Sequence, residues 1–311
     1  MLKSGAAFFL AGPLALLLAL PGFCQTSVKD DQGYDFPLGK PPQRIVSLAP
    51  NITEILYALG LGKEIVGVTR YCDYPPDALT KEKVGGLIDP DLERIRALNP
   101  DLIIAFRGNP LPVVQRMRSL HLPVFVLEMG PTLESVFPFL GRIGRVTRRE
   151  KEAAVLLQGL RAKYEAVGSA LRCDARKPRL FISLHGLGLW TCGRESYLTD
   201  MADKAGGTNI AGLIPKRWAN YGREQLLRDN PEVFIVFVKS PEDLGPAREW
   251  LSGQPYLQSL PAIKSGRIYP LDENKTSRYG PRLFDALEEL ARVLHPRCFE
   301  AKSALKPDSH R

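Results

Sequence analysis

Two glutamates occupy matching positions in two similar stretches of the chain. Glu93 and Glu224 each stand six residues before an Asn-Pro pair, which is followed at once by another acid and an apolar run. Because proline disfavours helical geometry in the residue before it, each stretch predicts a short helix that starts near its glutamate and leads into a strand. The helix dipole explains one such glutamate. A matched pair also suits docking onto a two-fold symmetric partner that presents arginines, and the residues alone leave both explanations open.

Two tryptophans lie in polar surroundings that are unusual for core residues. Trp190 precedes Thr-Cys-Gly, and Trp218 lies between Lys-Arg and Ala-Asn. An aromatic side chain buries about 150–250 Å², so it gives a broad, largely apolar ligand wide contact at a small entropic cost. Core packing is the ordinary alternative. The polar neighbours favour a place on the wall of a cleft, and Tyr221 is a further candidate of the same kind.

The sequence gives little support for catalysis. The chain carries no GxSxG, HExxH, P-loop or GxGxxG motif, so we expect neither an enzyme nor a resident cofactor. His185 closes a predicted strand and is a candidate metal ligand, although a single histidine is more often structural.

The spacing of the cysteines gives no support for a metal site. Besides Cys24 the chain has Cys72, Cys173, Cys192 and Cys298, and none of them has CxxC spacing. In an oxidising compartment these four cysteines allow three pairings. We favour a disulfide between Cys173 and Cys298, because both lie at the edges of the second half of the chain, and we leave Cys72 and Cys192 unassigned.

The first 24 residues predict an export signal. Lys3 supplies a positive start, an apolar stretch follows, and Gly22 and Cys24 are small residues at the two positions that a signal peptidase inspects. A lipoprotein anchored through Cys24 is the alternative, but it needs a small residue where the chain has Phe23. We therefore expect a periplasmic or otherwise exported protein with a cleaved signal peptide.

The composition is that of a globular protein with more than one compact unit. Of 311 residues 44% are hydrophobic and 24% charged, and a chain of this length usually divides between two cores. The formal net charge is +8, but neither a Lys/Arg block nor a nucleic-acid motif accompanies it. A solvated basic surface is the simplest interpretation, and no nucleic-acid partner is expected.

Apolar runs and helical patterns alternate along the chain and then restart. A leader rich in Gly and Pro at 25–43 is followed by a first α/β segment at 44–146. A second such segment fills 172–300, before a polar tail at 301–311. Buried strands separated by helices are typical of mostly parallel sheets. The sequence predicts an α/β protein with two Rossmann-like lobes.

A long helical pattern joins the two lobes. Residues 147–171 contain no proline, and their apolar residues recur at helical spacing. About 23 residues at 1.5 Å each make a rod of about 35 Å. A flexible linker would instead be rich in Gly, Ser or Pro. We therefore expect one stiff backbone helix between the lobes, which limits closure to a small tilt.

Between about residues 43 and 300 the chain carries a series of short motifs in a recognisable order. They are Arg44–Asn51 with Thr53-Glu54, Gly67–Pro76, Leu92–Ile95, Asn99–Ala105, Trp190–Ser196, Gly206–Asn209, Trp218, Arg223-Glu224 and Pro281-Arg282. Together they resemble the helical-backbone family of periplasmic binding proteins, which includes cobalamin, ferric-siderophore and haem receptors. The resemblance implies the class III periplasmic-binding-protein fold, in which two α/β lobes are joined by a single long helix.

The resemblance also implies a function and its partners. It points to a monomeric solute-binding component of an ABC importer, which captures cobalamin or a related corrinoid and delivers it to the membrane permease and its ATPase. Glu93 and Glu224 match two acids that hold arginines of the permease. The alternative ligand is a ferric siderophore or haem, and the candidate contacts to such an anionic chelate are Arg70, Arg107, Arg194 and Arg278.

The same resemblance places ligand contacts on both lobes. Tyr71 falls on the first-lobe wall, and Trp190 and Trp218 fall on the second-lobe wall. A second-lobe loop that runs from Asn274 to Arg278 matches a ligand-contacting segment.

Two of these positions depart from the cobalamin-binding members. Leu87 stands on the first-lobe wall where those members have a tryptophan, and Asn274 stands where they have an aspartate. These departures leave the exact chelate open.

Overall fold

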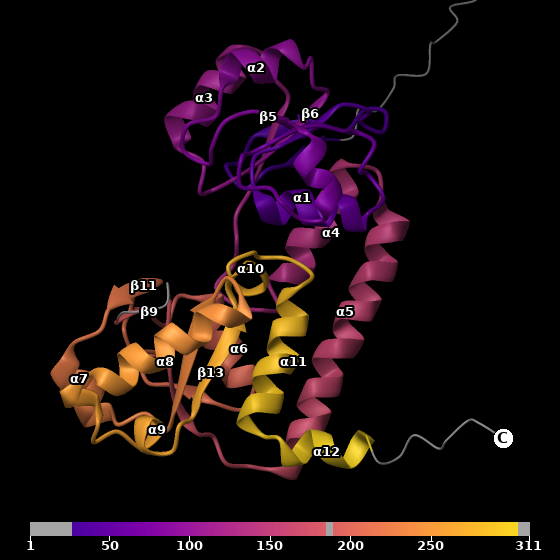
Figure 1. Ribbon diagram of the computed structural model, residues 1–311. Coiled ribbons are helices and arrows are strands. Elements are labelled where there is room, and N and C mark those ends of the chain that lie inside the picture. Colours follow the sequence, from indigo (N-terminus) through magenta and orange to yellow (C-terminus); the bar gives the residue numbers. More distant parts are fainter. Residues whose placement is uncertain (1–26, 185–188, 304–311) are drawn as a thin grey trace, which may run out of the picture.

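The chain folds into two α/β lobes that are joined along one side by a long helix (Figure 1). The computed structural model describes residues 27–184 and 189–303. The N-terminal lobe lies at the top of Figure 1 and the C-terminal lobe lies below it. The predicted class, two α/β lobes with parallel sheets and one connecting helix, is confirmed.

A parallel sheet with strand order β5-β4-β3-β6-β7 forms the centre of the N-terminal lobe. Its strands are β3 (Ile45–Ser47), β4 (Ile65–Val68), β5 (Glu82–Lys83), β6 (Leu102–Phe106) and β7 (Val124–Leu127). The helices beside it are α1 (Pro50–Ala58), η1 (Pro76–Thr80), α2 (Leu92–Ala97) and α3 (Leu111–Ser119). The central strands are almost wholly buried, because helices cover both faces of the sheet.

A second parallel sheet, with strand order β10-β8-β12-β13, forms the centre of the C-terminal lobe. Its strands are β8 (Arg179–Ser183), β10 (Thr208–Asn209), β12 (Val233–Val238) and β13 (Ile268–Asp272). A separate antiparallel pair consists of β9 (Trp190–Cys192) and β11 (Trp218–Asn220). The helices are α6 (Tyr197–Lys204), α7 (Arg223–Asp229), η3 (Pro241–Asp243), α8 (Leu244–Gly253), η4 (Pro255–Leu257), α9 (Pro261–Lys264), α10 (Glu273–Thr276), α11 (Leu283–Leu294) and α12 (Arg297–Ser303).

The connecting helix is α5 (Glu150–Ala170), whose 21 residues span about 30 Å. It begins at Glu150 and not at residue 147, because α4 (Val136–Val146) ends just before and the chain turns at Arg148, whose φ is +58°. After α5 a short helix, η2 (Leu171–Cys173), leads into the C-terminal lobe. Figure 1 shows α5 running beside α4 at its upper end and beside α11 at its lower end.

One apolar core runs through both lobes. A single cluster of buried side chains includes Ile104 of the N-terminal sheet, Leu140 of α4, Leu160 of α5 and Ile182 of the C-terminal sheet. Two smaller clusters fill the outer faces of the two sheets. The lobes are therefore packed on a common helical layer rather than linked by chain alone.

The two lobes repeat one arrangement of side chains at the amino ends of their sheets. Asp101 accepts a hydrogen bond from the backbone N–H of Arg44 at 2.9 Å, and Glu232 accepts one from the backbone N–H of Arg179 at 3.2 Å. The guanidinium groups of both arginines donate to carbonyl oxygens of the Asn-Pro turns. The asparagines of these turns have φ values of 45° and 47°. The sequence duplication thus extends to matched contacts.

The leader is an ordered hairpin of β1 (Ser27–Lys29) and β2 (Asp35–Pro37). The ring of Phe36 packs 5.6 Å from that of Phe125, and the buried carboxylate of Asp30 pairs with Arg118. The predicted polar tail also begins inside an element, because α12 continues to Ser303.

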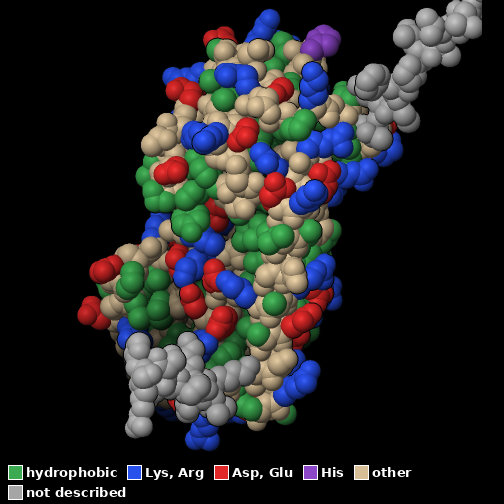
Figure 2. Space-filling model, turned by 90° about the vertical axis from the view of Figure 1, so that its right-hand side faces the viewer, with side chains coloured by type: hydrophobic (Ala, Val, Ile, Leu, Met, Phe, Trp, Pro, Cys, Tyr) green, Lys and Arg blue, Asp and Glu red, His purple; other side chains and the backbone are tan. Residues whose placement is uncertain are grey.

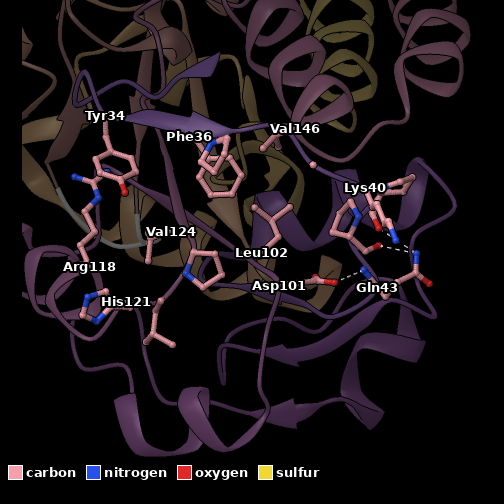
Figure 3. A pocket seen from close by; sticks show the side chains of 16 residues that line it. Tyr34, Phe36, Lys40, Gln43, Asp101, Leu102, Arg118, His121, Val124 and Val146 are labelled. Atoms are coloured by element: carbon pink, nitrogen blue, oxygen red, sulfur yellow. Dashed lines mark hydrogen bonds between the residues drawn. The ribbon is translucent and has the colours of Figure 1, made fainter. Parts of the chain in front are cut away.

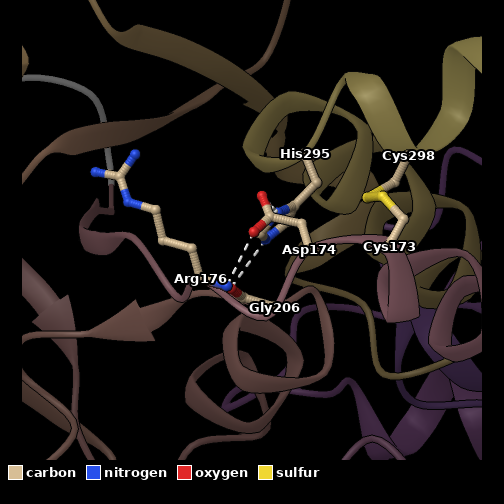
Figure 4. Close-up of a disulfide and its surroundings, with 6 residues drawn as sticks. All are labelled: Cys173, Asp174, Arg176, Gly206, His295 and Cys298. Atoms are coloured by element: carbon tan, nitrogen blue, oxygen red, sulfur yellow. Dashed lines mark hydrogen bonds and ion pairs between the residues drawn. A yellow bond between two sulfur atoms is a disulfide. The ribbon is translucent and has the colours of Figure 1, made fainter.

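A disulfide joins Cys173 and Cys298, the pair that the sequence favours (Figure 4). Their Cα atoms lie 5.7 Å apart, and 125 residues separate them in sequence. Beside them the buried ring of His295 places Nδ1 3.0 Å from a carboxylate oxygen of Asp174 and Nε2 3.0 Å from the carbonyl oxygen of Gly206. The disulfide and the histidine together fasten the end of the chain to the start of the C-terminal lobe.

Charged side chains of both signs are interspersed over the face in Figure 2. This distribution agrees with a solvated surface as the reason for the net charge. Within the described ranges, no helix has the length and apolarity that a membrane crossing requires.

Candidate ligand-binding cleft

The carboxyl ends of the parallel strands in the two lobes face each other. The loop after β4 reaches the segment between α10 and α11, where Oδ1 of Asp73 lies 2.5 Å from Nη1 of Arg278. Nδ2 of Asn51, on α1, donates to the carbonyl oxygen of Tyr279 at 3.3 Å. Ligands of open α/β sheets bind in the crevice outside the carboxyl ends of the strands. The cleft between these facing ends is therefore the candidate site.

The first-lobe wall presents apolar and aromatic side chains on the loops that follow β4 and β5. Tyr71 is 51% exposed, and the guanidinium of Arg70 lies 5.6 Å from the centre of its ring. Leu87 is half-buried, and its carbonyl oxygen accepts a hydrogen bond from Nδ2 of Asn109 at 2.7 Å. The neighbouring Ile88, which sequence reasoning missed, is 71% exposed. An isolated apolar residue in a loop gives no pattern that would have identified it.

The second-lobe wall is built on the antiparallel pair of β9 and β11. Trp190 lies opposite Asn220, and Trp218 lies opposite Cys192, so the tryptophans are diagonal neighbours on one face of the two strands. They line a pocket of about 260 Å³. Its lining residues are Leu184, Trp190, Tyr197, Leu198, Trp218, Phe237, Glu273 and Ser277. The structure thus brings together the two predicted tryptophans.

Tyr221, the further aromatic candidate, does not lie on this wall. Its ring is 3% exposed and packs 5.4 Å from that of Phe181 in the core on the outer face of the C-terminal sheet. Burial, together with a hydrogen bond to Asp229, raises the pKa of its phenol. The interpretation of Tyr221 as a cleft residue is therefore wrong, because its position after β11 turns it inward.

The segment from Asn274 to Arg278 begins in the short helix α10 and is not wholly the predicted loop. It lies at the edge of the second-lobe pocket, but its arginine points across to the other lobe. Oδ1 of Asn274 accepts a hydrogen bond from Nη2 of Arg278 at 3.3 Å. Nη1 of Arg278 donates to Oε1 of Glu54 at 2.9 Å. The guanidinium expected to contact a ligand is thus engaged by three side chains of the protein, the third being Asp73.

Glu54, Asp73, Arg278 and Arg282 form what we call the interlobe ion cluster. Glu54 is 5% exposed, and its second oxygen, Oε2, accepts a hydrogen bond from Nε of Arg282 at 2.8 Å. The guanidinium of Arg282 also lies 3.9 Å from the ring centre of Tyr74. Burial by itself would raise the pKa of Asp73, but the hydrogen bond and charge of Arg278 outweigh it and lower that pKa. The cluster ties the two lobes together at the floor of the cleft.

The two matched glutamates occupy the same position in their helices. Glu93 is the second residue of α2, and Glu224 is the second residue of α7; both are exposed. In α2 the side chain of Asp91 caps the helix by accepting from the backbone N–H of Glu93 at 3.1 Å. Each helix leads into the amino end of a strand, α2 into β6 and α7 into β12. Figure 1 places α2 on the upper lobe and α7 on the lower one.

A further hollow lies away from the cleft (Figure 3). It measures about 690 Å³ and lies between the leader hairpin and the amino ends of β6 and β7, opposite to the ends that face the other lobe. Tyr34 and Arg118 form one side of it, with the guanidinium 4.6 Å from the ring centre, and Phe36 and Leu102 line its floor. We interpret this hollow as a gap in the packing beneath the leader hairpin and not as a ligand site.

Cysteine and histidine give no metal site in the described part of the chain. Cys72 and Cys192 are both buried, and burial raises the pKa of the Cys72 thiol and raises that of Cys192 to about 11. Neither thiol is thereby suited to bind a metal as a thiolate. No group of three or more His, Cys, Asp or Glu side chains there is placed to hold an ion. His185 lies outside the described residues.

Both the sequence and the fold are similar to those of known proteins. A family model described as "Periplasmic binding protein" matches residues 45–275. The chain is 31% identical over 257 residues to the Vitamin B12-binding protein of Pectobacterium carotovorum, which covers 81% of this chain and 88% of that protein. It is 25% identical over 280 residues to the ABC transporter substrate-binding lipoprotein YvrC of Bacillus subtilis, covering 88% of this chain and 87% of the relative.

A solved structure shows the same architecture. The apo form of the periplasmic heme-binding protein RhuT from Roseiflexus sp. RS-1 matches with a TM-score of 0.73 at 27% identity. The match covers 82% of this chain and 99% of that one.

Proposed function

The chain belongs to the periplasmic binding protein family, and from this premise we propose that it captures cobalamin or a related corrinoid between its lobes for an ABC importer. We further propose that it acts in the periplasm as a monomeric carrier, without catalysis and without a resident cofactor. The permease and its ATPase are the partners of the proposal. It is supported by relatives whose names describe vitamin B12 binding and substrate binding for an ABC transporter.

The pair of facing walls is the observation that carries the ligand assignment. A corrin is a broad plate with an apolar rim and amide arms. Trp190 and Trp218 offer it a flat apolar surface on one side, and Tyr71, Leu87 and the exposed Ile88 offer one on the other. Aromatic and aliphatic surfaces of this kind bind such a plate by area more than by polar contacts.

A titration of the mature protein tests the assignment. Cyanocobalamin, haemin and a ferric siderophore are added in turn while tryptophan fluorescence is followed. We expect saturable quenching by cyanocobalamin, because two of the tryptophans line the pocket. A clear response to haemin or the siderophore with none to any corrinoid would replace the proposal with the alternative ligand class.

Replacing Trp190 or Trp218 with alanine is expected to weaken corrinoid binding. Truncation of a buried aromatic contact typically costs about 2 kcal/mol, which corresponds to about 30-fold in affinity. Calorimetric titration measures the change without relying on tryptophan emission. Tyr34→Ala is the matched control, because Tyr34 is an exposed aromatic on the leader, away from the cleft. If either tryptophan variant bound the corrinoid as tightly as the wild type does, that tryptophan would not be part of the proposed wall.

The double variant Glu93→Ala/Glu224→Ala is expected to bind ligand normally and to support less uptake. The two exposed carboxylates lie on different lobes, so we propose that they engage arginines of the permease at two points and set its register. Each exposed ion pair contributes about 0.2–1 kcal/mol, so the double loss should slow uptake severalfold. The control is Glu165→Ala/Glu249→Ala, which removes two exposed glutamates from α5 and α8. Uptake equal to that of the control would contradict docking through these residues.

Ligand binding is expected to tilt the lobes only slightly. The continuous core and the packing of α5 on α4 and α11 leave no flexible hinge between them. Small-angle scattering with and without ligand should therefore give nearly equal radii of gyration. A large decrease on ligand addition would show a closing motion that this packing does not permit.

A further inference from the structure

We propose, resting on the proposed function, that the cleft discriminates against anionic chelates because three of its arginines are already neutralised by carboxylates of the chain. Arg70, Arg107 and Arg278 all lie at the carboxyl ends of the N- or C-terminal sheet or on the loops beside them. Each of the three is bound to at least one acid in the structure. The specificity-determining residues are therefore the acids, above all Asp73 and Asp89.

Arg278 is the most firmly engaged of the three. Its side chain is 9% exposed, with Oε1 of Glu54 at 2.9 Å and Oδ1 of Asp73 at 2.5 Å from the same nitrogen. An anionic ligand that took over this guanidinium would have to displace Asp73 or leave the buried Glu54 short of a partner. Glu54 would then keep only Arg282, and the loss of one of two partners is costly for a buried carboxylate, so the exchange opposes anion binding.

Arg70 is neutralised on the first-lobe wall itself. It pairs with Asp89 across Gly86, where an added Cβ would lie 2.2 Å from the carboxylate and 2.6 Å from the guanidinium. The glycine thus allows the pair to close tightly over the loop that carries Leu87. Because the guanidinium also contacts the ring of Tyr71, its charge lies next to the proposed ligand surface together with its counter-charge.

Arg107 completes the set at the ends of two adjacent strands. It follows β6, whereas Glu128 follows β7, and the two side chains form an ion pair. Arg194, the remaining candidate for anion binding, lies in the turn after β9 and does not line the second-lobe pocket.

The consequence is that the positive charges of these three arginines are matched by nearby negative ones. A chelate whose arms are amides needs no charged partner there and binds through its plate. A chelate whose arms are carboxylates meets Asp73, Asp89 and Glu128 as repelling charges, with no unpaired guanidinium from this set to compensate. The ligand class that fits is a chelate with uncharged arms.

Two corrinoids with the same plate and different arms test the inference directly. Cobinamide carries amide arms, and cobyrinic acid carries carboxylate arms. We expect calorimetric titration of the wild-type protein to show cobinamide binding at least about tenfold more tightly, the effect of roughly one unfavourable charge contact. Equal affinity for the two corrinoids, or a preference for the acid, would overturn the inference.

Freeing the arginines should reverse part of this preference. In Asp73→Asn/Asp89→Asn, Arg278 keeps Glu54 and the fold keeps its buried pair, while two negative charges leave the cleft. We expect cobyrinic acid to bind about tenfold more tightly than to wild type, with cobinamide changed less than about threefold. Asp35→Asn is the control, because it removes a carboxylate paired with Lys29 on the leader hairpin. An unchanged ratio in the double variant would also overturn the inference.

Failure of the proposed function is distinguishable from failure of this inference. If neither corrinoid binds but haemin does, the ligand assignment is wrong, and the same comparison is made between haemin and its dimethyl ester. Tighter binding of the uncharged ester would still support selection by neutralised arginines. Tighter binding of haemin, whose propionates are charged, would overturn it.

Discussion

Replacing Cys173 and Cys298 together with serine is expected to lower the free energy of unfolding by about 4–5 kcal/mol. The disulfide closes a stretch of 125 residues that includes nearly all of the C-terminal lobe. Joining the ends of so long a stretch restricts the unfolded chain more than it restricts the folded one, and the restriction grows with loop length. Denaturant unfolding followed by circular dichroism measures the change.

Reduction of the wild-type protein supplies the matched comparison. The wild type should lose stability in reductant to about the level of the double-serine variant, which itself should be insensitive to reductant. The contact of His295 with Asp174 and Gly206 remains in both cases, so the segment beside the disulfide keeps one attachment. Equal unfolding midpoints with and without reductant would contradict the prediction.

Replacing Glu54 with alanine is expected to destabilise the protein by about 3–5 kcal/mol. Glu54 is the acid that Arg278 and Arg282 share, and its side chain is 3% exposed. Its removal leaves Arg278, itself 9% exposed, with the partly exposed Asp73 as its remaining acidic partner in the cluster. Calorimetric unfolding measures the loss, which should appear as a lower midpoint for the whole molecule because both lobes contribute to the contact.

Two further variants separate charge from packing in this prediction. Glu54→Gln keeps the volume and one acceptor oxygen, so it should destabilise less than alanine does. Glu152→Ala removes a glutamate that pairs with Arg149 on the surface of α5, and it should leave stability almost unchanged. A Glu54→Ala protein as stable as Glu152→Ala would show that the interlobe ion cluster does not hold the lobes.

The architecture was accessible from the sequence because its signals are local. The run Val233–Val238 is apolar throughout, as expected for a strand that is buried on both faces, and it forms β12. The helical spacing of Ala153, Leu160 and Val167 likewise predicted α5, whose buried stripe contains these residues. The start of the helix was misplaced, because helical spacing continues across the turn at Arg148.

The walls of the cleft were harder to predict, because they are formed by contacts between residues that are distant in the sequence. β9 and β11 have three residues each, so neither is long enough to show the alternation of apolar and polar residues that predicts a strand. They also pair across an intervening segment that contains α6 and β10. The polar neighbours of Trp190 and Trp218 were a usable signal. The same reasoning failed for Tyr221, because polar neighbours do not tell which way a side chain turns at the end of so short a strand.

The interlobe ion cluster could not be derived from the sequence alone. Glu54 is a single acid on an apolar helix, next to Ile55 and Leu56, and such a residue indicates a buried partner. It does not indicate which one, since Arg278 lies 224 residues further along the chain. Arg278 was accordingly considered as a contact for an anion, whereas the folded chain itself supplies its anions, Glu54 and Asp73.

The core that passes through α4 and α5 also limits how the molecule could be divided. A polypeptide that stopped before α5 would keep the first sheet but would leave Phe137 and Leu140 of α4 without their cover. A polypeptide that began after α5 would likewise uncover Phe284 and Leu287 of α11. Although the halves repeat each other, neither has an apolar interior that closes on its own. We therefore expect separately produced halves to be insoluble alone and to regain structure only by associating with each other.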